Sequence, residues 1–372
     1  MSIITFSDVH WGAHGQDAQA LYEELTIIKQ AILEEDTKLV VMCGDYYDRK
    51  IDFTSDAAVL SIKFMNELRE ACRIKGAILR FIRGTRSHDL NQLNNFKSFE
   101  TGDGMFRVID TVEEEEVLPG FKVLYIPEEY PIDYKQYYEE LLYKKPDGYY
   151  DFIFGHGSIH YAIWYLEHCL SEKNMGTAPV FNEKDFTRVC KNKTVFGHVH
   201  KHCIYDNKVF YNGSFSRQCH GEEDAKGFLI FDMQTFEHFF IENEKAPIFK
   251  ALKFSQILED AHGSFEEAAQ FIQNLSASDG KLRIDFDTPV TDEQQTQMNI
   301  IKEVASKQPN MTVKARKKTT KTSGIAKEFD FLIDGHKNPI DTISKYIKIT
   351  TGKDLNSSEL NDIITKTDSK DK

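Results

Sequence analysis

Residues 1–84 alternate short apolar runs with amphipathic stretches, and this alternation constrains the fold more than any other feature of the chain. The apolar runs at residues 3–6, 39–43 and 77–82 have the length and composition of buried strands. Residues 18–35 and 56–73, which separate them, show helical periodicity. Strands and helices in this order predict parallel pairing within a layered α/β unit.

The rest of the chain predicts a β-rich second half and a separate module. Apolar runs that precede loops or turns lie at residues 122–127, 150–154, 194–196, 208–211 and 227–231. A boundary near residues 243–252 precedes a small α+β module, with strands at 281–286 and 311–316 around a helix from residue 291. Residues 339–364 predict two short helices, and the polar end of the chain is expected to fray.

Polar motifs follow most of the predicted strands, in loops that contain glycine. In parallel sheets such loops gather at one edge, where functional sites form. A lone His-x-His or Gly-Asp is more often an ordinary surface, core or turn feature, but the shared position of these motifs predicts one convergent site. The candidate side chains are Asp8, His10, Asp45, Asp48, Ser87, His88, Asp89, His156, His198 and His200.

This mixture of side chains indicates a metal centre. Aspartate and histidine together suit borderline ions such as manganese, iron or zinc, rather than the all-oxygen shells of calcium or magnesium. A carboxylate shared by two cations holds them about 3.5–4 Å apart, as in two-metal phosphatases and nucleases. The sequence therefore predicts two divalent metal ions, with manganese expected and magnesium, iron or zinc as alternatives.

The order of these motifs resembles that of the calcineurin-like metallophosphoesterase superfamily. Residues 8–12 and 197–217, together with Lys226-Gly227-Phe228, are more narrowly similar to SbcD-type DNA repair exonucleases, which phages also encode. The similarity covers residues 1–235, and the later module resembles that family's capping domain in outline only. The resemblance implies an α/β fold: a four-layer β-sandwich flanked by helices, with an added small α+β capping domain and C-terminal helices. The implied boundaries are a nuclease domain at 1–245, a DNA-binding capping domain at 246–330 and an ATPase-binding region at 331–372.

The resemblance also implies roles for individual residues. One ion would be held by Asp8, His10, Asp45 and His200, and the other by Asp45, His156 and His198. His88 would act catalytically beside the scissile phosphate, with Asp89 orienting it, while Asp48 would support a ligand from behind.

The third motif departs from the pattern of that family. Its members usually have Gly-Asn-His-Asp, in which the asparagine amide oxygen binds the second ion. Here the loop is longer and Ser87 precedes His88. Ser87 is therefore the expected metal ligand, although a neutral serine oxygen binds metal more weakly than an amide carbonyl.

The implied function is a manganese-dependent DNA exonuclease and endonuclease subunit of an SbcCD-like repair and recombination complex. It would form a homodimer and act on DNA with an SMC-like ATPase subunit. A small-molecule or protein phosphoesterase with the same dinuclear chemistry is the alternative. A non-enzymatic scaffold with a decayed metal site is a further one, against which the other ligand candidates argue.

Charge gives the DNA substrate mixed support. The formal net charge is −13, whereas phosphate contacts need lysine and arginine. Bound cations would offset this charge at the site itself. Arg86 and Arg217 would contact DNA phosphates or serve as ion-pair partners. A basic stretch at 314–321 is either a second DNA contact or a solvated loop, and its candidates are Lys314, Arg316, Lys317 and Lys318.

Other features bear on location and on the remaining histidines. No apolar run is long enough for a membrane helix, and residues 1–6 do not resemble a signal peptide. The six cysteines are scattered and form no Cys-x-x-Cys pair, which favours a reducing cytoplasm, that of the host if a phage encodes the chain.

Surface or supporting roles are expected for the histidines outside the motifs: His14, His160, His202 and His220.

Overall fold

The computed structural model describes residues 1–100, 102–161, 179–275, 280–287, 292–307 and 311–315. The chain divides into two units, Met1–Lys314 and Ala315–Lys372, and apart from Ala315 the described residues belong to the first. The predicted C-terminal helical region at 331–372 lies outside the described residues, as do Arg316, Lys317 and Lys318. The predicted domain boundaries remain predictions.

The first sheet carries the strands that were predicted in residues 1–84. Its strand order is β14-β13-β1-β2-β3-β4. Strands β1 to β4 pair in parallel, and β13 adds to β1 in the antiparallel direction. The strands are β1 (Ser2–Phe6), β2 (Thr37–Cys43), β3 (Ile78–Ile82), β4 (Phe106–Ile109), β13 (Gly227–Asp232) and β14 (His238–Glu242).

The second sheet has the order β11-β12-β10-β7-β6-β5. Its four inner strands, β12, β10, β7 and β6, are parallel, while β11 and β5 pair antiparallel at the two edges. The strands are β5 (Glu113–Leu118), β6 (Phe121–Ile126), β7 (Tyr150–His156), β10 (Cys190–Gly197), β11 (Cys203–Tyr205) and β12 (Val209–Tyr211), and a separate small pair is β8 (Ser158–Ile159) with β9 (Val180–Phe181).

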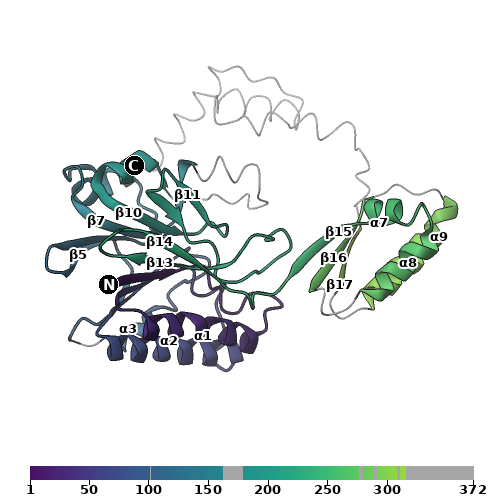
Figure 1. Ribbon diagram of the computed structural model, residues 1–372, viewed down its shortest axis with the longest axis horizontal. Coiled ribbons are helices and arrows are strands. Elements are labelled where there is room, and N and C mark those ends of the chain that lie inside the picture. Colours follow the sequence, from purple (N-terminus) through teal and green to yellow (C-terminus); the bar gives the residue numbers. More distant parts are fainter. Residues whose placement is uncertain (101, 162–178, 276–279, 288–291, 308–310, 316–372) are drawn as a thin grey trace, which may run out of the picture. The chain divides into compact units, whose positions relative to one another are not determined.

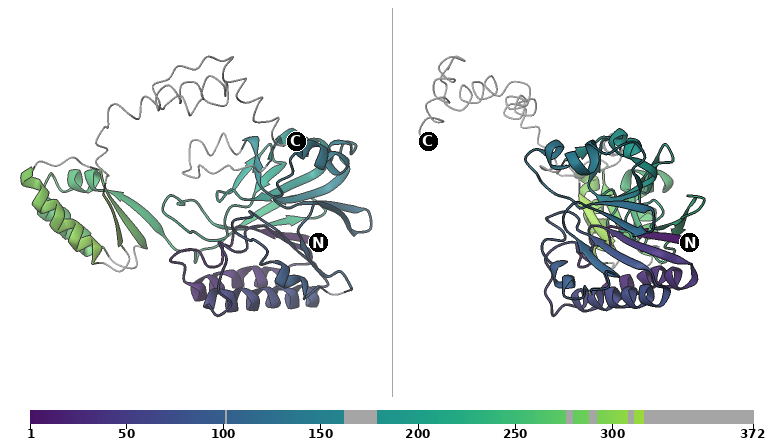
Figure 2. Two further views of the ribbon diagram at one scale, coloured as in Figure 1. Left: turned by 180° about the vertical axis from the view of Figure 1, so that it is seen from behind. Right: turned by 90° about the vertical axis from the view of Figure 1, so that its left-hand side faces the viewer.

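Three apolar cores hold these sheets and their helices in four layers. Residues from both sheets, such as Val41 and Phe154, form the core between them. The outer face of the first sheet packs on helices through Met42 and Phe64, and that of the second through Ile153 and Phe186. Figures 1 and 2 show α1 and α2 side by side along the first sheet. The predicted four-layer α/β sandwich is confirmed. Its helical segments are α1 (Ala18–Glu34), α2 (Asp56–Lys75), α3 (Asn94–Lys97), α4 (Tyr134–Tyr137), the π-helix η1 (Glu139–Tyr143) and α6 (Glu183–Val189).

Local capping explains where the two long helices begin and end. The Asp17 side chain accepts hydrogen bonds from the backbone N–H groups of Gln19 and Ala20 at the start of α1. Ser55 caps α2 in the same way, and Gly76 ends that helix in the left-handed conformation that glycine adopts most easily. Among the described helices, none is long and apolar enough to cross a membrane.

The α+β module beyond residue 248 has its own three-stranded sheet, in the order β15-β16-β17. The predicted strand, helix and strand correspond to β16, α9 and β17, whereas β15, α7 and α8 were not foreseen. Apolar side chains such as Phe254, Ile272 and Ile284 form a core of its own. The elements are β15 (Phe249–Lys253), α7 (Phe254–Asp260), α8 (Phe265–Asn274), β16 (Lys281–Phe286), α9 (Asp292–Ser306) and β17 (Met311–Ala315).

An ion pair between a buried arginine and a half-buried glutamate joins the two sheets of the sandwich. Arg80 on β3 is 1% exposed, and its Nη2 and Nε atoms lie 2.6 and 2.9 Å from the two carboxylate oxygens of Glu115 on β5. Nη2 also donates to the backbone oxygen of Gly104. Since a buried guanidinium needs a charged partner, the pair fixes how these strands of opposite sheets face each other.

We expect Glu115→Gln to lower the free energy of unfolding by on the order of 3 kcal/mol, because the Arg80 charge would stay buried without its counter-ion. Chemical denaturation followed by circular dichroism measures this loss. Glu116→Gln on the same strand is the control, because Glu116 is exposed, and it should change stability by less than about 0.5 kcal/mol. Equal stability of the two variants would contradict the role given to the ion pair.

Candidate metal centre

The ends of β1 and β2 bring three candidate ligands together through paired loops. The Asp8 N–H donates to the Gly44 oxygen at 3.0 Å, and the His10 N–H donates to the Asp45 oxygen at 3.1 Å. Asp8, His10 and Asp45 all have positive φ, at 52°, 52° and 54°. Few residues other than glycine adopt this conformation, so the surrounding structure must hold it in place, as is common at functional sites.

The second sheet contributes three histidines from the ends of β7 and β10. The His156 ring has Nδ1 2.8 Å from the Cys43 oxygen, which leaves Nε2 facing Asp45. A Cβ at Gly44 would overlap this ring, so only glycine lets the two sheets approach this closely here. The His198 N–H donates to the Asp8 carboxylate at 3.0 Å, which ties the β10 loop to the β1 loop.

Most of the predicted ligands converge in three groups, within each of which the ligand atoms all lie within 4.8 Å of one another. His10 Nε2 lies 3.1 Å from His200 Nε2. Asp45 Oδ2 lies 3.8 Å from His10 Nε2 and 3.2 Å from His156 Nε2, so this carboxylate belongs to both predicted ion sites. The groups are Asp8, His10 and His200; His10, Asp45 and His88; and Asp45, His156 and His198.

The donor set fits a pair of divalent cations. Asp8, His10, Asp45 and His156 are at most 3% exposed, so their carboxylates and imidazoles have little water to solvate them. Burial alone would raise the pKa of Asp45, but the adjacent imidazoles, His156 above all, hold it well below its usual value. These charges therefore keep Asp45 ionised. Aspartate and histidine side chains thus form a candidate dinuclear metal site.

Two further carboxylates hold ligating rings from behind. Glu222 Oε1 lies 2.7 Å from His200 Nδ1, and the buried Lys226 ammonium lies 3.6 Å from the other Glu222 oxygen. Burial would raise the pKa of Glu222, but the His200 hydrogen bond and the nearby charges lower it to about 2. Asp48 Oδ1 lies 3.6 Å from His10 Nδ1, as a supporting role requires. Such contacts fix ring orientation and ligand basicity. Glu222 was not among the predicted site residues, because its contact with His200 is tertiary.

The third loop places His88 at the rim and Asp89 beneath it. The His88 side chain is 31% exposed, with Nδ1 3.0 Å from His10 Nδ1 and 3.8 Å from Asp45 Oδ2. Asp89 is fully buried and accepts backbone hydrogen bonds from Asp45, Tyr47 and Gly84. Asp89 therefore fixes the second and third loops together, and its task of orienting the His88 imidazole stays a prediction.

Ser87 is exposed, and its role as a metal ligand stays a prediction. Thr85 of the same loop faces the candidate ligands, with Oγ1 3.2 Å from Asp45 Oδ2 and 3.3 Å from His156 Nε2. In this longer loop, the residue that faces the site in this way is Thr85, directly after Gly84, whereas Ser87 lies directly before His88. Beside Thr85 lies Glu128, which the sequence analysis did not name although it follows a predicted strand.

The remaining candidates lie outside these groups. Arg217 donates to the backbone oxygens of Ala246 and Asp224, which favours the structural role over a phosphate contact. Arg86 is exposed, with its guanidinium 5.0 Å from the centre of the Tyr130 ring. Lys314 lies on β17, at the end of the described part of the chain. The histidines expected to have other roles, His14, His160, His202 and His220, are absent from the three described groups.

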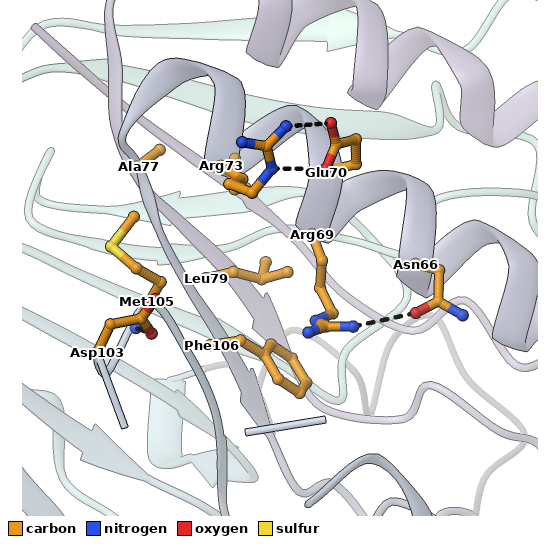
Figure 3. Close-up of a pocket in the computed structure, with 10 residues that line it drawn as sticks. Asn66, Arg69, Glu70, Arg73, Ala77, Leu79, Asp103, Met105 and Phe106 are labelled. Atoms are coloured by element: carbon orange, nitrogen blue, oxygen red, sulfur yellow. Dashed lines mark hydrogen bonds and ion pairs between the residues drawn. The ribbon is translucent and has the colours of Figure 1, made fainter. Parts of the chain in front are cut away.

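A cavity of about 190 Å³ between α2 and the start of β4 contains none of the metal-ligand candidates (Figure 3). Arg69 in its wall donates to Asn66 and to the Phe99 oxygen, and Arg73 is paired with Glu70. The guanidinium groups of Arg69 and Arg73 thus bind partners within the protein. The metal centre therefore remains the better candidate for a catalytic site.

We expect Asp45→Asn to weaken the binding of both divalent ions by about ten-fold or more, because one carboxylate serves both groups. His156→Asn should weaken only one of them. Titration calorimetry with Mn²⁺ gives the stoichiometry and affinities, and the exposed Asp36→Asn serves as the control. An Asp45→Asn protein that loses only one ion would show that this carboxylate does not bridge.

Comparisons with known proteins identify the family of the chain. The family model for calcineurin-like phosphoesterases matches residues 1–202. No curated protein matches the chain. Among solved structures, the protein TT1561 of Thermus thermophilus is 11% identical, with a TM-score of 0.39, over 65% of this chain and 99% of that one. A dimetal phosphatase from Danio rerio is 11% identical, with a TM-score of 0.34, over 62% and 91%. Because the family model matches more than half of this chain, the chain belongs to the calcineurin-like phosphoesterase family.

Proposed function

We propose that the chain is a manganese-dependent DNA nuclease that hydrolyses phosphodiester bonds as part of an SbcCD-like complex. The observation that carries the hydrolytic part is the convergence of two ligand groups on Asp45, with the partly exposed His88 at their rim. Membership of the phosphoesterase family gives the reaction class. The narrower choice of DNA as substrate is ours.

The residues of the chain have separate tasks in this reaction. When bound, two divalent ions would polarise the phosphate and supply an activated water. His88 lies where it can donate a hydrogen bond to a phosphate oxygen or a proton to the leaving oxygen. Asp48 and Glu222 keep the His10 and His200 rings in position, so little reorganisation is needed when substrate arrives.

The choice of DNA rests on what lies outside the metal centre. A module with its own sheet and core follows the sandwich, and a phosphatase of small molecules has no need for one. The exposed guanidinium of Arg86 belongs to the loop that carries His88, where it could contact a neighbouring phosphate. The motif similarities at residues 8–12 and 197–217 point the same way.

Partners and location follow from the same proposal. The chain would pair with a second copy and with an SMC-like ATPase, which residues 331–372 would bind. A cytoplasmic site of action, in the host for a phage protein, is in keeping with the free state of four described cysteines: Cys43, Cys72, Cys190 and Cys203.

The nuclease prediction is tested with linear duplex DNA and a small chromogenic phosphodiester, each with Mn²⁺. We expect degradation of DNA, and His88→Ala should lower its rate by roughly 100-fold or more while two manganese ions still bind. His160→Ala is the control, because His160 is exposed and absent from the ligand groups.

Two results would contradict parts of this proposal. Full DNA cleavage by His88→Ala would remove the role given to that imidazole. Hydrolysis of the small diester without cleavage of DNA, with or without a candidate ATPase subunit, would favour the alternative of a small-molecule phosphoesterase. The net charge of −13 is the observation on the side of that alternative.

A further inference from the structure

The second ion site contains a hydroxyl where the family pattern has an amide. The Thr85 N–H donates to Asp45 Oδ1 at 2.6 Å, and its Oγ1 faces both Asp45 and His156. A neutral hydroxyl binds a divalent ion weakly. With Thr85 alone in that position, the site would have only Asp45, His156 and His198 as strong ligands.

A buried carboxylate stands next to this hydroxyl. Glu128 follows β6, and its side chain is 4% exposed. Its Oε2 lies 3.3 Å from Thr85 Oγ1, 3.6 Å from His198 Nδ1 and 3.9 Å from His156 Nε2. Glu128 thus faces the two histidines of the second ion site.

Local contacts hold the Glu128 side chain in this orientation. The Tyr130 hydroxyl donates to Oε1, the other oxygen of the Glu128 carboxylate. The backbone N–H of Glu128 donates to the Arg83 oxygen at 3.2 Å, which joins its loop to the loop that carries Thr85. Oε2 is therefore presented to the ion site by a fixed side chain.

We propose that Glu128 is a ligand of the second metal ion, in place of the amide that the third motif lacks. This inference rests on the two-metal part of the proposed function and not on DNA as the substrate. Asp45 and Glu128 both face His156 Nε2, and two buried carboxylates directed at one nitrogen repel each other unless a cation lies between them. Because Glu128 adds a negative charge that an amide would not, it should bind the ion more tightly.

A simpler role for Glu128 would be that of a counter-ion to histidines that carry protons. The two roles predict different effects on metal affinity when the charge of Glu128 is removed. Removing the charge of a counter-ion destabilises the metal-free protein and does not weaken manganese binding, because the histidines then hold their protons less tightly. A ligand changes the affinity of one ion and has no direct effect on the other.

The test is a Mn²⁺ titration of the full-length protein by calorimetry, with free Mn²⁺ followed by electron paramagnetic resonance. Glu128→Gln keeps the shape of the side chain and removes its charge. We expect it to weaken one of the two ions by roughly ten-fold or more and leave the other unchanged. Glu129→Gln is the matched control, because Glu129 instead accepts hydrogen bonds from Val112 and Tyr137.

A second variant restores the ligand of the family pattern. Thr85→Asn combined with Glu128→Gln should recover part of the lost affinity, since an amide oxygen then lies beside Asp45. Thermal denaturation without metal shows that each variant is folded.

The outcomes separate the two claims. Two ions bound by wild type, with affinities in Glu128→Gln that are unchanged or higher, would overturn the ligand role alone. A lower melting temperature without metal in that variant would then identify Glu128 as a counter-ion. Wild-type protein that binds fewer than two ions would overturn the two-metal function itself.

Discussion

The metal centre depends on one shared carboxylate, that of Asp45, at the junction of the two sheets. Its Oδ2 faces His10 from the first sheet at 3.8 Å and His156 from the second at 3.2 Å. Asp45 therefore has its full set of partners only when the sandwich is assembled. Because a buried carboxylate without compensating charge is costly, this residue couples the packing of the sheets to the capacity to hold cations.

The loops around Asp45 are held by the backbone as much as by side chains. Asp89 accepts N–H groups from three positions, and Asp8 accepts the His198 N–H across the sheet junction. The positive φ angles of Asp8 and His198, at 52° and 96°, persist because these contacts determine them. Ligands that are already in place when a substrate arrives reduce the reorganisation that catalysis would otherwise require.

The sequence predicted what depends on local pattern and missed what depends on tertiary contact. Apolar runs and helical periodicity were sufficient to place the inner strands and long helices of the sandwich, but not its edge strands β4, β5, β11 and β14, and strand ends identified the Asp and His candidates. Loop length alone did not reveal whether Thr85 or Ser87 faces the site. The contacts of Glu222 with His200 and of Glu128 with His198 join residues far apart in the chain. Nothing in a single sequence shows such pairs, although the position of Glu128 after β6 follows the same strand-end rule as the ligands.

The composition of the second ion site also bears on the class of phosphate that the centre would accept. A carboxylate from Glu128 would offset more of the cations' charge than an amide does, so the centre would be less positive toward its substrate. A phosphomonoester carries about −1.5 to −2 charges near neutral pH, whereas each phosphate of a DNA backbone carries one. Reduced positive charge costs more binding energy for the doubly charged group, because the attraction scales with the product of the charges. With Glu128 as a ligand, the centre would therefore lose more of its attraction for a phosphomonoester than for a phosphodiester.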